Sequence, residues 1–125
     1  MSELTQADID LLAIGLMGWK KHPSDSTVKP WLQVWLDEEG REVAGGDWNP
    51  ETSWEACGQL LERLRAMPEV REAWVFFCDA DNEWACELYS TFGDSYERAE
   101  TAPQAVAAAA LALVKKMEES NGTKQ

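Results

Sequence analysis

Histidine is scarce in this sequence, which limits the chemistry that the chain can perform. Only one occurs, His22, and it lies in a loop-like segment, 22–30, that contains two prolines. One histidine cannot by itself complete a Ser-His-Asp relay or a zinc site, and no Cys-x-x-Cys or His-x-x-x-His pair is present. The sequence therefore argues against both kinds of centre, and we interpret His22 as an incidental surface residue.

Basic residues are also few. The chain has 11 Lys and Arg against 23 Asp and Glu, which gives a net charge of −12. Binding to a phosphate backbone requires clustered Lys and Arg, so we expect no direct binding to nucleic acid. The acidity fits either a solubilising surface or an acidic face that engages a basic partner. The carboxylates are spread along the chain, which favours the first interpretation.

Long apolar runs are absent. The N-terminal MSELTQADID has no basic region followed by an apolar core, and no apolar stretch reaches the ~18 residues of a membrane span. We therefore expect a cytoplasmic protein. Its cysteines are odd in number, at positions 57, 78 and 86, and they indicate buried thiols rather than a disulfide framework.

Tryptophan is abundant, with seven indoles in 125 residues. A chain of this length predicts one domain, for which we expect residues 1–119, followed by a flexible tail at 120–125. Seven indoles cannot all be central in so small a core. Some of them should lie at the surface or at an interface, where a large ring with one polar atom is well suited.

Hydrophobic periodicity predicts an α+β fold with the element order α-β-β-α-β-β-α. Helices are expected between Thr5 and Pro23, between Thr52 and Pro68, and from Thr101 to about Glu118. Strands are expected at 31–37, at 41–44 and in a hairpin at 71–89. Short turns imply antiparallel pairing, so we predict a sheet of about three to four strands packed with three helices. Residues 90–100 fit either a short strand or a structured loop.

Each predicted helix begins with a capping pattern and carries an apolar stripe. Thr5, Thr52 and Thr101 are the expected caps, each followed three residues later by an acidic residue or glutamine. The stripes should be buried, and they consist of Ile9, Leu12, Leu16 and Trp19; Trp54, Cys57, Leu61 and Leu64; and Val106, Ala110, Leu113 and Met117.

The hairpin at 71–89 is the expected centre of the sheet. A three-residue loop, Asp81 to Glu83, would set Cys78 opposite Cys86. One face would then be core, made of Trp74, Phe76, Cys78, Trp84, Cys86 and Leu88. The other face is half apolar, because Glu87 lies between Ala85 and Tyr89, and it could be wet or partly covered.

The strand at 31–37 alternates between aliphatic residues and a face with Trp31 and Trp35. The tryptophan face is either covered by a second layer or part of a partner site. We select Trp31 and Trp35, together with Trp48 in the loop that follows, as candidate partner-binding residues because tryptophan is enriched at binding hot spots. A homodimer through this face is left open.

Acidic residues suggest no catalytic or metal site. Asp79, Asp81 and Glu83 match the first, third and fifth positions of a calcium loop, but Trp84 and Ser90 replace the required Gly and Glu. No carboxylate pair or phosphate-binding loop can be identified. We therefore predict no enzyme, no cofactor and no catalytic or metal-binding residues.

Three segments together carry a family resemblance. They are Leu16-Met17-Gly18-Trp19, Trp48 to Ala56 (WNPETSWEA), and Glu100 to Ala105 (ETAPQA) with the alanine-rich helix that follows. In their order and spacing the chain resembles the phage ABA sandwich domain family of small phage and prophage proteins. The resemblance implies a phage origin, a host bacterial cytoplasm and a compact αβ domain. It implies no activity and no site residues.

Two functions remain as hypotheses. The first is a non-enzymatic phage accessory protein that binds a host or phage protein through an acidic, Trp-rich surface, with inhibition of a bacterial defence component as its specific form. The alternative is a binder of a small molecule or nucleotide signal, in which tryptophan rings of an aromatic pocket stack on a base. A weak enzyme using the acidic loop has no substrate to suggest it.

Overall fold

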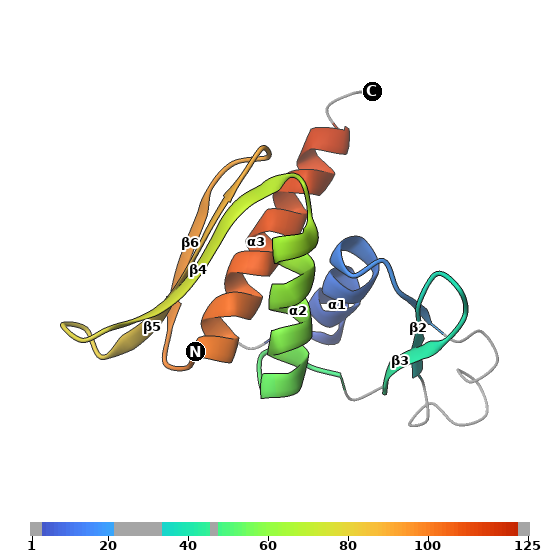
Figure 1. Cartoon of the computed structure of the whole chain (residues 1–125), viewed down its shortest axis with the longest axis horizontal. Coiled ribbons are helices and arrows are strands. Elements are labelled where there is room, and N and C mark those ends of the chain that lie inside the picture. The colour runs from blue at the N-terminus through green and yellow to red at the C-terminus, as the bar shows by residue number, and fades with distance from the viewer. Residues whose placement is uncertain (1–3, 22–33, 46–47, 123–125) are drawn as a thin grey trace.

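The computed structural model describes residues 4–21, 34–45 and 48–122. The helices are α1 (Gln6–Leu11), which continues into the π-helix η1 (Leu12–Leu16), α2 (Trp54–Ala66) and α3 (Ala102–Gly122). The strands are β1 (Lys20–Lys21), β2 (Val34–Leu36), β3 (Glu42–Gly45), β4 (Val70–Cys78), β5 (Glu83–Ser90) and β6 (Ser95–Ala99). The predicted α+β class is confirmed (Figure 1). No helix in these ranges is long and apolar enough to cross a membrane.

The strands form two antiparallel sheets of three strands each, β1-β2-β3 and β4-β5-β6. The predicted order of helices and hairpins is present, with two strands added to it. β1 occupies the end of the segment that was predicted as the first helix. β6 pairs with β5, from Leu88 opposite Ser95 to Trp84 opposite Ala99, so residues 95–99 are a strand.

Helix α3 lies between the sheet β4-β5-β6 and the other helices (Figure 1). It packs against all three strands of that sheet and against α2, α1 and η1. Its predicted stripe is confirmed for Val106, Ala110 and Leu113, which are buried, while Met117 is half-buried. Alanines at 105, 107 and 109 are buried as well. Because alanine side chains are short, layers on opposite sides of α3 can approach it closely.

Helix η1 approaches α3 at a glycine. A Cβ atom on Gly15 would lie 3.1 Å from Cγ1 of Val114, closer than side chains normally pack. The π-helical turn places the Met17 N–H 3.1 Å from the carbonyl oxygen of Leu12. Arg63 of α2 donates a hydrogen bond from Nε to the carbonyl of Leu16 at 2.8 Å. A side chain of α2 thus bonds a carbonyl at the C-terminal end of η1, where the last carbonyls of a helix have no partner within it.

The predicted cap of the first helix is confirmed. The Asp8 N–H donates to Oγ1 of Thr5 at 3.1 Å, and the Thr5 N–H donates to Oδ2 of Asp8 at 3.2 Å. The cap of α3 is confirmed too, because the Gln104 N–H donates to Oγ1 of Thr101 at 3.2 Å. Caps of this kind satisfy backbone donors that have no partner within the helix.

Helix α2 begins one residue later than predicted. A turn from Asn49, in which the Ser53 N–H donates to the Asn49 carbonyl at 3.1 Å, leaves Thr52 outside the helix. Ser53 is the cap. The prediction that Trp54 is buried is wrong, because this residue stands at the first helical position and is 68% exposed. Burial on α2 begins two residues after Trp54, with Ala56, Cys57, Leu60 and Leu64.

The register of the β4–β5 hairpin also differs from the prediction. The turn has four residues, Asp79 to Asn82, and Cys78 lies opposite Glu83 rather than Cys86. Asn82 adopts a positive φ of 55°, which asparagine tolerates better than most residues. Because side chains alternate along a strand, this odd shift reverses the two faces of β4.

The faces of the sheet are therefore as follows. Residues Ala73 and Val75 point to the helices together with Cys86 and Leu88, and they pack against the core. The other side of β4 carries Trp74, Phe76 and Cys78. The prediction that these three residues belong to the core beneath the helices is wrong.

Candidate functional site

The tryptophans that were predicted to bind a partner lie in the core where the structure describes them. Trp35 is 3% exposed and Trp48 is 7% exposed. The Trp48 ring makes an edge contact with Trp19, with centroids 5.0 Å apart, and its Nε1–H donates to Oε1 of Gln59 at 2.8 Å. Trp31 lies outside the described residues. Trp35 and Trp48 are thus buried core residues in the described part of the chain.

An arginine pairs with two carboxylates at the acidic turn of the hairpin. Arg98 of β6 donates to Oδ2 of Asp81, and its Nε lies 3.6 Å from Oε1 of Glu83. Two of the three carboxylates in the calcium-like pattern thus face a guanidinium group. Within the described ranges, no group of three or more potential metal ligands is present.

Two exposed aromatic residues, Trp74 and Tyr96, lie on the sheet β4-β5-β6 on the side away from α2 and α3. In the described part of the chain no helix lies over this side (Figure 1). We call it the open face and define it by Glu72, Trp74, Phe76, Ala85, Glu87, Tyr89, Tyr96 and Arg98. Trp74 is 55% exposed and Tyr96 is 48% exposed. Large exposed aromatic side chains are unusual on a surface without a partner.

One row of the open face crosses all three strands. Trp74 of β4 lies opposite Glu87 of β5, and Glu87 lies opposite Tyr96 of β6. Directly opposed residues on neighbouring strands have Cβ atoms about 4.5–5.5 Å apart, so their side chains meet. The row therefore makes Glu87 the cross-strand neighbour of both Trp74 and Tyr96.

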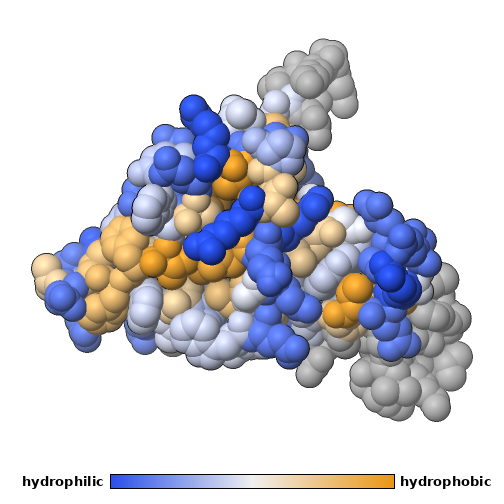
Figure 2. All heavy atoms as spheres, in the orientation of Figure 1, coloured by the Kyte–Doolittle hydropathy of each residue, from blue (hydrophilic) through white to orange (hydrophobic). Residues whose placement is uncertain are grey.

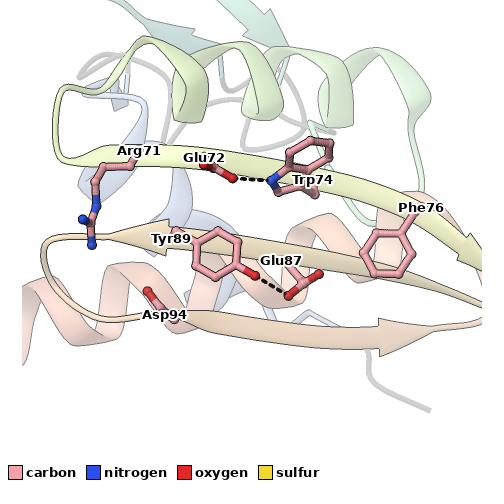
Figure 3. A pocket seen from close by; sticks show the side chains of 7 residues that line it. All are labelled: Arg71, Glu72, Trp74, Phe76, Glu87, Tyr89 and Asp94. Atoms are coloured by element: carbon pink, nitrogen blue, oxygen red, sulfur yellow. Dashed lines mark hydrogen bonds between the residues drawn. The ribbon is translucent and has the colours of Figure 1, made fainter.

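A hollow of about 600 Å³ opens beside this row (Figure 3). Its lining consists of Arg71, Glu72, Trp74, Phe76, Glu87, Tyr89 and Asp94. Arg71 reaches this side because the register shifts between Val70 and Glu72, and such a bulge re-aims a side chain. Aromatic rings and carboxylates thus share one concave surface.

Hydrogen bonds orient the carboxylates of the hollow. Trp74 donates from Nε1 to Oε1 of Glu72, and Tyr89 donates from its hydroxyl to Oε2 of Glu87, both at 2.7 Å (Figure 3). The bond to Glu87 raises the pKa of Tyr89 above its usual value, so the phenol stays protonated and keeps donating at neutral pH. Each carboxylate retains a second oxygen that can accept a bond from a ligand.

No ion pair among the described residues includes Glu87. The ion pairs of Arg41 are with Asp37 and Glu39, and those of Arg98 are with Asp81 and Glu83. Glu87 is half-buried at the centre of the sheet. A cation supplied by a ligand could pair with this carboxylate.

Sequence reasoning missed Trp74 as a surface residue. The apolar alternation of β4 is equally strong on both faces, so it could not decide which one is covered. The signal that could have decided it was Glu87, which marks the outward side of β5, combined with a four-residue turn ending in Asn82.

A second apolar area lies over the β4–β5 hairpin (Figure 2). There Phe77 and Trp84 make an edge contact, with ring centroids 5.4 Å apart.

The comparisons with known proteins agree with the fold. The model of the phage ABA sandwich domain matches residues 10–111. A crystal structure of a phage protein from Bacillus cereus ATCC 14579 is similar, with a TM-score of 0.61 and 19% identity, covering 92% of this chain and 93% of that one. No curated protein matches the chain. Because the family model matches most of the sequence, the chain belongs to the phage ABA sandwich domain family.

Proposed function

We propose that this phage-family protein is non-enzymatic and acts by binding another protein through the open face. The observation that carries the proposal is Trp74, a 55% exposed indole at the midpoint of the edge strand β4 on an uncovered sheet face. Trp and Tyr contribute much of the binding energy in protein interfaces, and here Trp74 and Tyr96 flank the same carboxylate. The binding surface thus differs from the one predicted at Trp31, Trp35 and Trp48.

Charge favours a basic partner. The hollow is lined by three acidic residues, Glu72, Glu87 and Asp94, and by one basic residue, Arg71. The whole chain carries a net charge of −12. Complementary charge accelerates association and selects among partners. Because the family is a phage family, we propose bacterial defence proteins with basic surfaces as the first partners to screen.

The test is affinity capture from infected cells with the wild type, Trp74→Ala and Trp54→Ala, followed by measurement of Kd with the purified partner. Trp54 is the matched control, since it is 68% exposed but lies on α2, away from the open face. We expect Trp74→Ala to weaken binding at least tenfold and Trp54→Ala to leave it unchanged. Equal binding by wild type and Trp74→Ala, with both folded, would exclude the open face.

A second candidate is a small ligand held in the hollow. The volume of about 600 Å³ and the rings of Trp74, Phe76 and Tyr89 suit stacking on a planar ligand. Three carboxylates against one guanidinium disfavour a phosphate group there, and this is why the protein partner ranks first. In a thermal-shift screen against nucleotides and nucleosides, a rise of several degrees that Trp74→Ala removes would favour the small ligand instead.

A further inference from the structure

The environment of Glu87 points to the chemistry of the partner. Three aromatic residues are neighbours of Glu87 in the sheet. Trp74 and Tyr96 flank it across the strands, and Tyr89 donates a hydrogen bond to its Oε2 from the same strand. Aromatic faces attract cations through their quadrupoles, and a carboxylate among them adds a full negative charge.

The charged groups nearby leave Glu87 available. On β5 itself Tyr89 remains protonated, and on β4 the nearest ionisable group is Glu72, which accepts from Trp74. On β6 the cation is Arg98, whose ion pairs are with Asp81 and Glu83 at the turn. Arg71 lines the hollow but forms no ion pair among the described residues. The site therefore combines aromatic rings with three carboxylates and one cation, Arg71, and no ion pair among the described residues includes Glu87.

We infer that the open face recognises an arginine side chain on the partner protein, with the guanidinium seated over Glu87 and against the rings of Trp74 and Tyr96. This inference rests on the proposed function and names the partner group that would bind there. A guanidinium is planar and stacks on aromatic rings, and it donates two parallel hydrogen bonds to one carboxylate. An ammonium is more strongly hydrated and cannot stack, so lysine fits this site less well.

The source of the group is a protein rather than a free small molecule. Trp74 and Tyr96 are about half exposed on a face that extends over three strands, well beyond the area of one guanidinium. A partner that buries both rings gains far more contact than free arginine could provide.

The experiment is an NMR titration of the full chain that follows the Trp74 indole N–H. The probes are three capped pentapeptides, Gly-Ser-Xaa-Ser-Gly, in which Xaa is arginine, citrulline or lysine. Citrulline has nearly the shape of arginine without its charge. We expect the arginine peptide to shift the Trp74 indole signal with a Kd at least fivefold lower than that of the citrulline peptide, with lysine between them. Capped arginine alone should bind no more tightly than the arginine peptide.

Protein variants separate site recognition from general attraction. Glu87→Gln should weaken binding of the arginine peptide at least fivefold. Glu62→Gln removes the same charge from the exposed surface of α2 and should change the Kd by less than twofold. Trp74→Ala, followed through neighbouring backbone signals, should weaken binding of the arginine peptide as well. This second variant still tests the site if Glu87→Gln folds poorly.

The outcomes distinguish this inference from the proposed function. If arginine and citrulline peptides bind equally, or if no peptide binds, the guanidinium inference is overturned. It is also overturned if Glu62→Gln weakens binding as much as Glu87→Gln does. The proposed function then stands or falls separately, on whether Trp74→Ala weakens binding of the captured partner at least tenfold.

Discussion

The inner and outer faces of the sheet β4-β5-β6 differ in chemistry, as two neighbouring residues of β5 illustrate. Cys86 points toward the helices and is fully buried, and this burial, with smaller contributions from Cys57 and Glu87, raises the pKa of its thiol to about 12. Glu87, the next residue, lies on the open face with a carboxylate that accepts a bond from Tyr89. Burial on the inner face keeps the Cys86 thiol protonated and neutral, whereas the outer face carries the carboxylate of Glu87. Stability and recognition are thus assigned to alternate residues of one strand.

The largest expected effect is on the inner face. Leu88 is fully buried in the core, and Leu88→Ala should lower the free energy of unfolding by about 2–5 kcal/mol, since it removes buried methyl groups and leaves a cavity. Urea denaturation monitored by circular dichroism would measure this loss. A change below about 1 kcal/mol would mean that the inner face is not the core of the sheet.

The second prediction concerns pH. The unfolded thiol of Cys86 loses its proton near pH 9.0, whereas the folded thiol keeps it until about pH 12. Between these values the unfolded state binds fewer protons, so stability should fall as pH rises, by up to about 1.4 kcal/mol per pH unit from this residue.

Denaturation of Cys86→Ala at pH 8 and at pH 10.5 checks this sign. The variant should lose less stability over that interval than the wild type does. Cys57, whose pKa is also raised by burial, should account for part of the slope that remains. An identical pH dependence in wild type and Cys86→Ala would contradict the assignment.

The third prediction is a small effect. Trp74→Thr replaces a large exposed ring with another residue that favours strands, so the free energy of unfolding should change by no more than about 0.5 kcal/mol. The same denaturation assay measures it. A loss as large as that of Leu88→Ala would show that Trp74 is structural and would remove the contrast between the faces.

The smallest expected effect is a change in the pKa of Tyr89 on the open face. Because the hydrogen bond to Glu87 is the main cause of the raised pKa of Tyr89, Glu87→Gln should lower that pKa toward the usual tyrosine value. The chain has two tyrosines, so Tyr96→Phe is the background in which ultraviolet absorbance reports Tyr89 alone. An unchanged titration curve would mean that the bond between Tyr89 and Glu87 does not form in solution.

Features that depend on local sequence were predictable. The caps at Thr5 and Thr101 use residues only three positions apart, and the apolar stripe of α3 follows from one helical period. The α+β class follows in the same way from the order of such segments. At the candidate site, the grouping of Glu87 with Tyr89 on one side of β5 was predictable from alternation alone.

Features that depend on distant layers were not predictable. Trp35 and Trp74 each stand in an alternating apolar strand, yet Trp35 is 3% exposed and Trp74 is 55% exposed. Alternation within each of these strands contains no difference that reports which face a helix will cover. The pairing of Trp74 with Glu87 depended further on the backbone conformation at Asn82, which sets the register.

The turn from Asp79 to Asn82 touches neither the core nor the hollow, yet its length determines which side chains each receives. Removing or inserting one residue there, with β5 held in place, would offer Trp74 and Phe76 to the helices and Ala73 and Val75 to solvent. Among relatives, a change of turn length is therefore an evolutionary event that could exchange an aromatic recognition surface for an aliphatic one without any substitution in the strands.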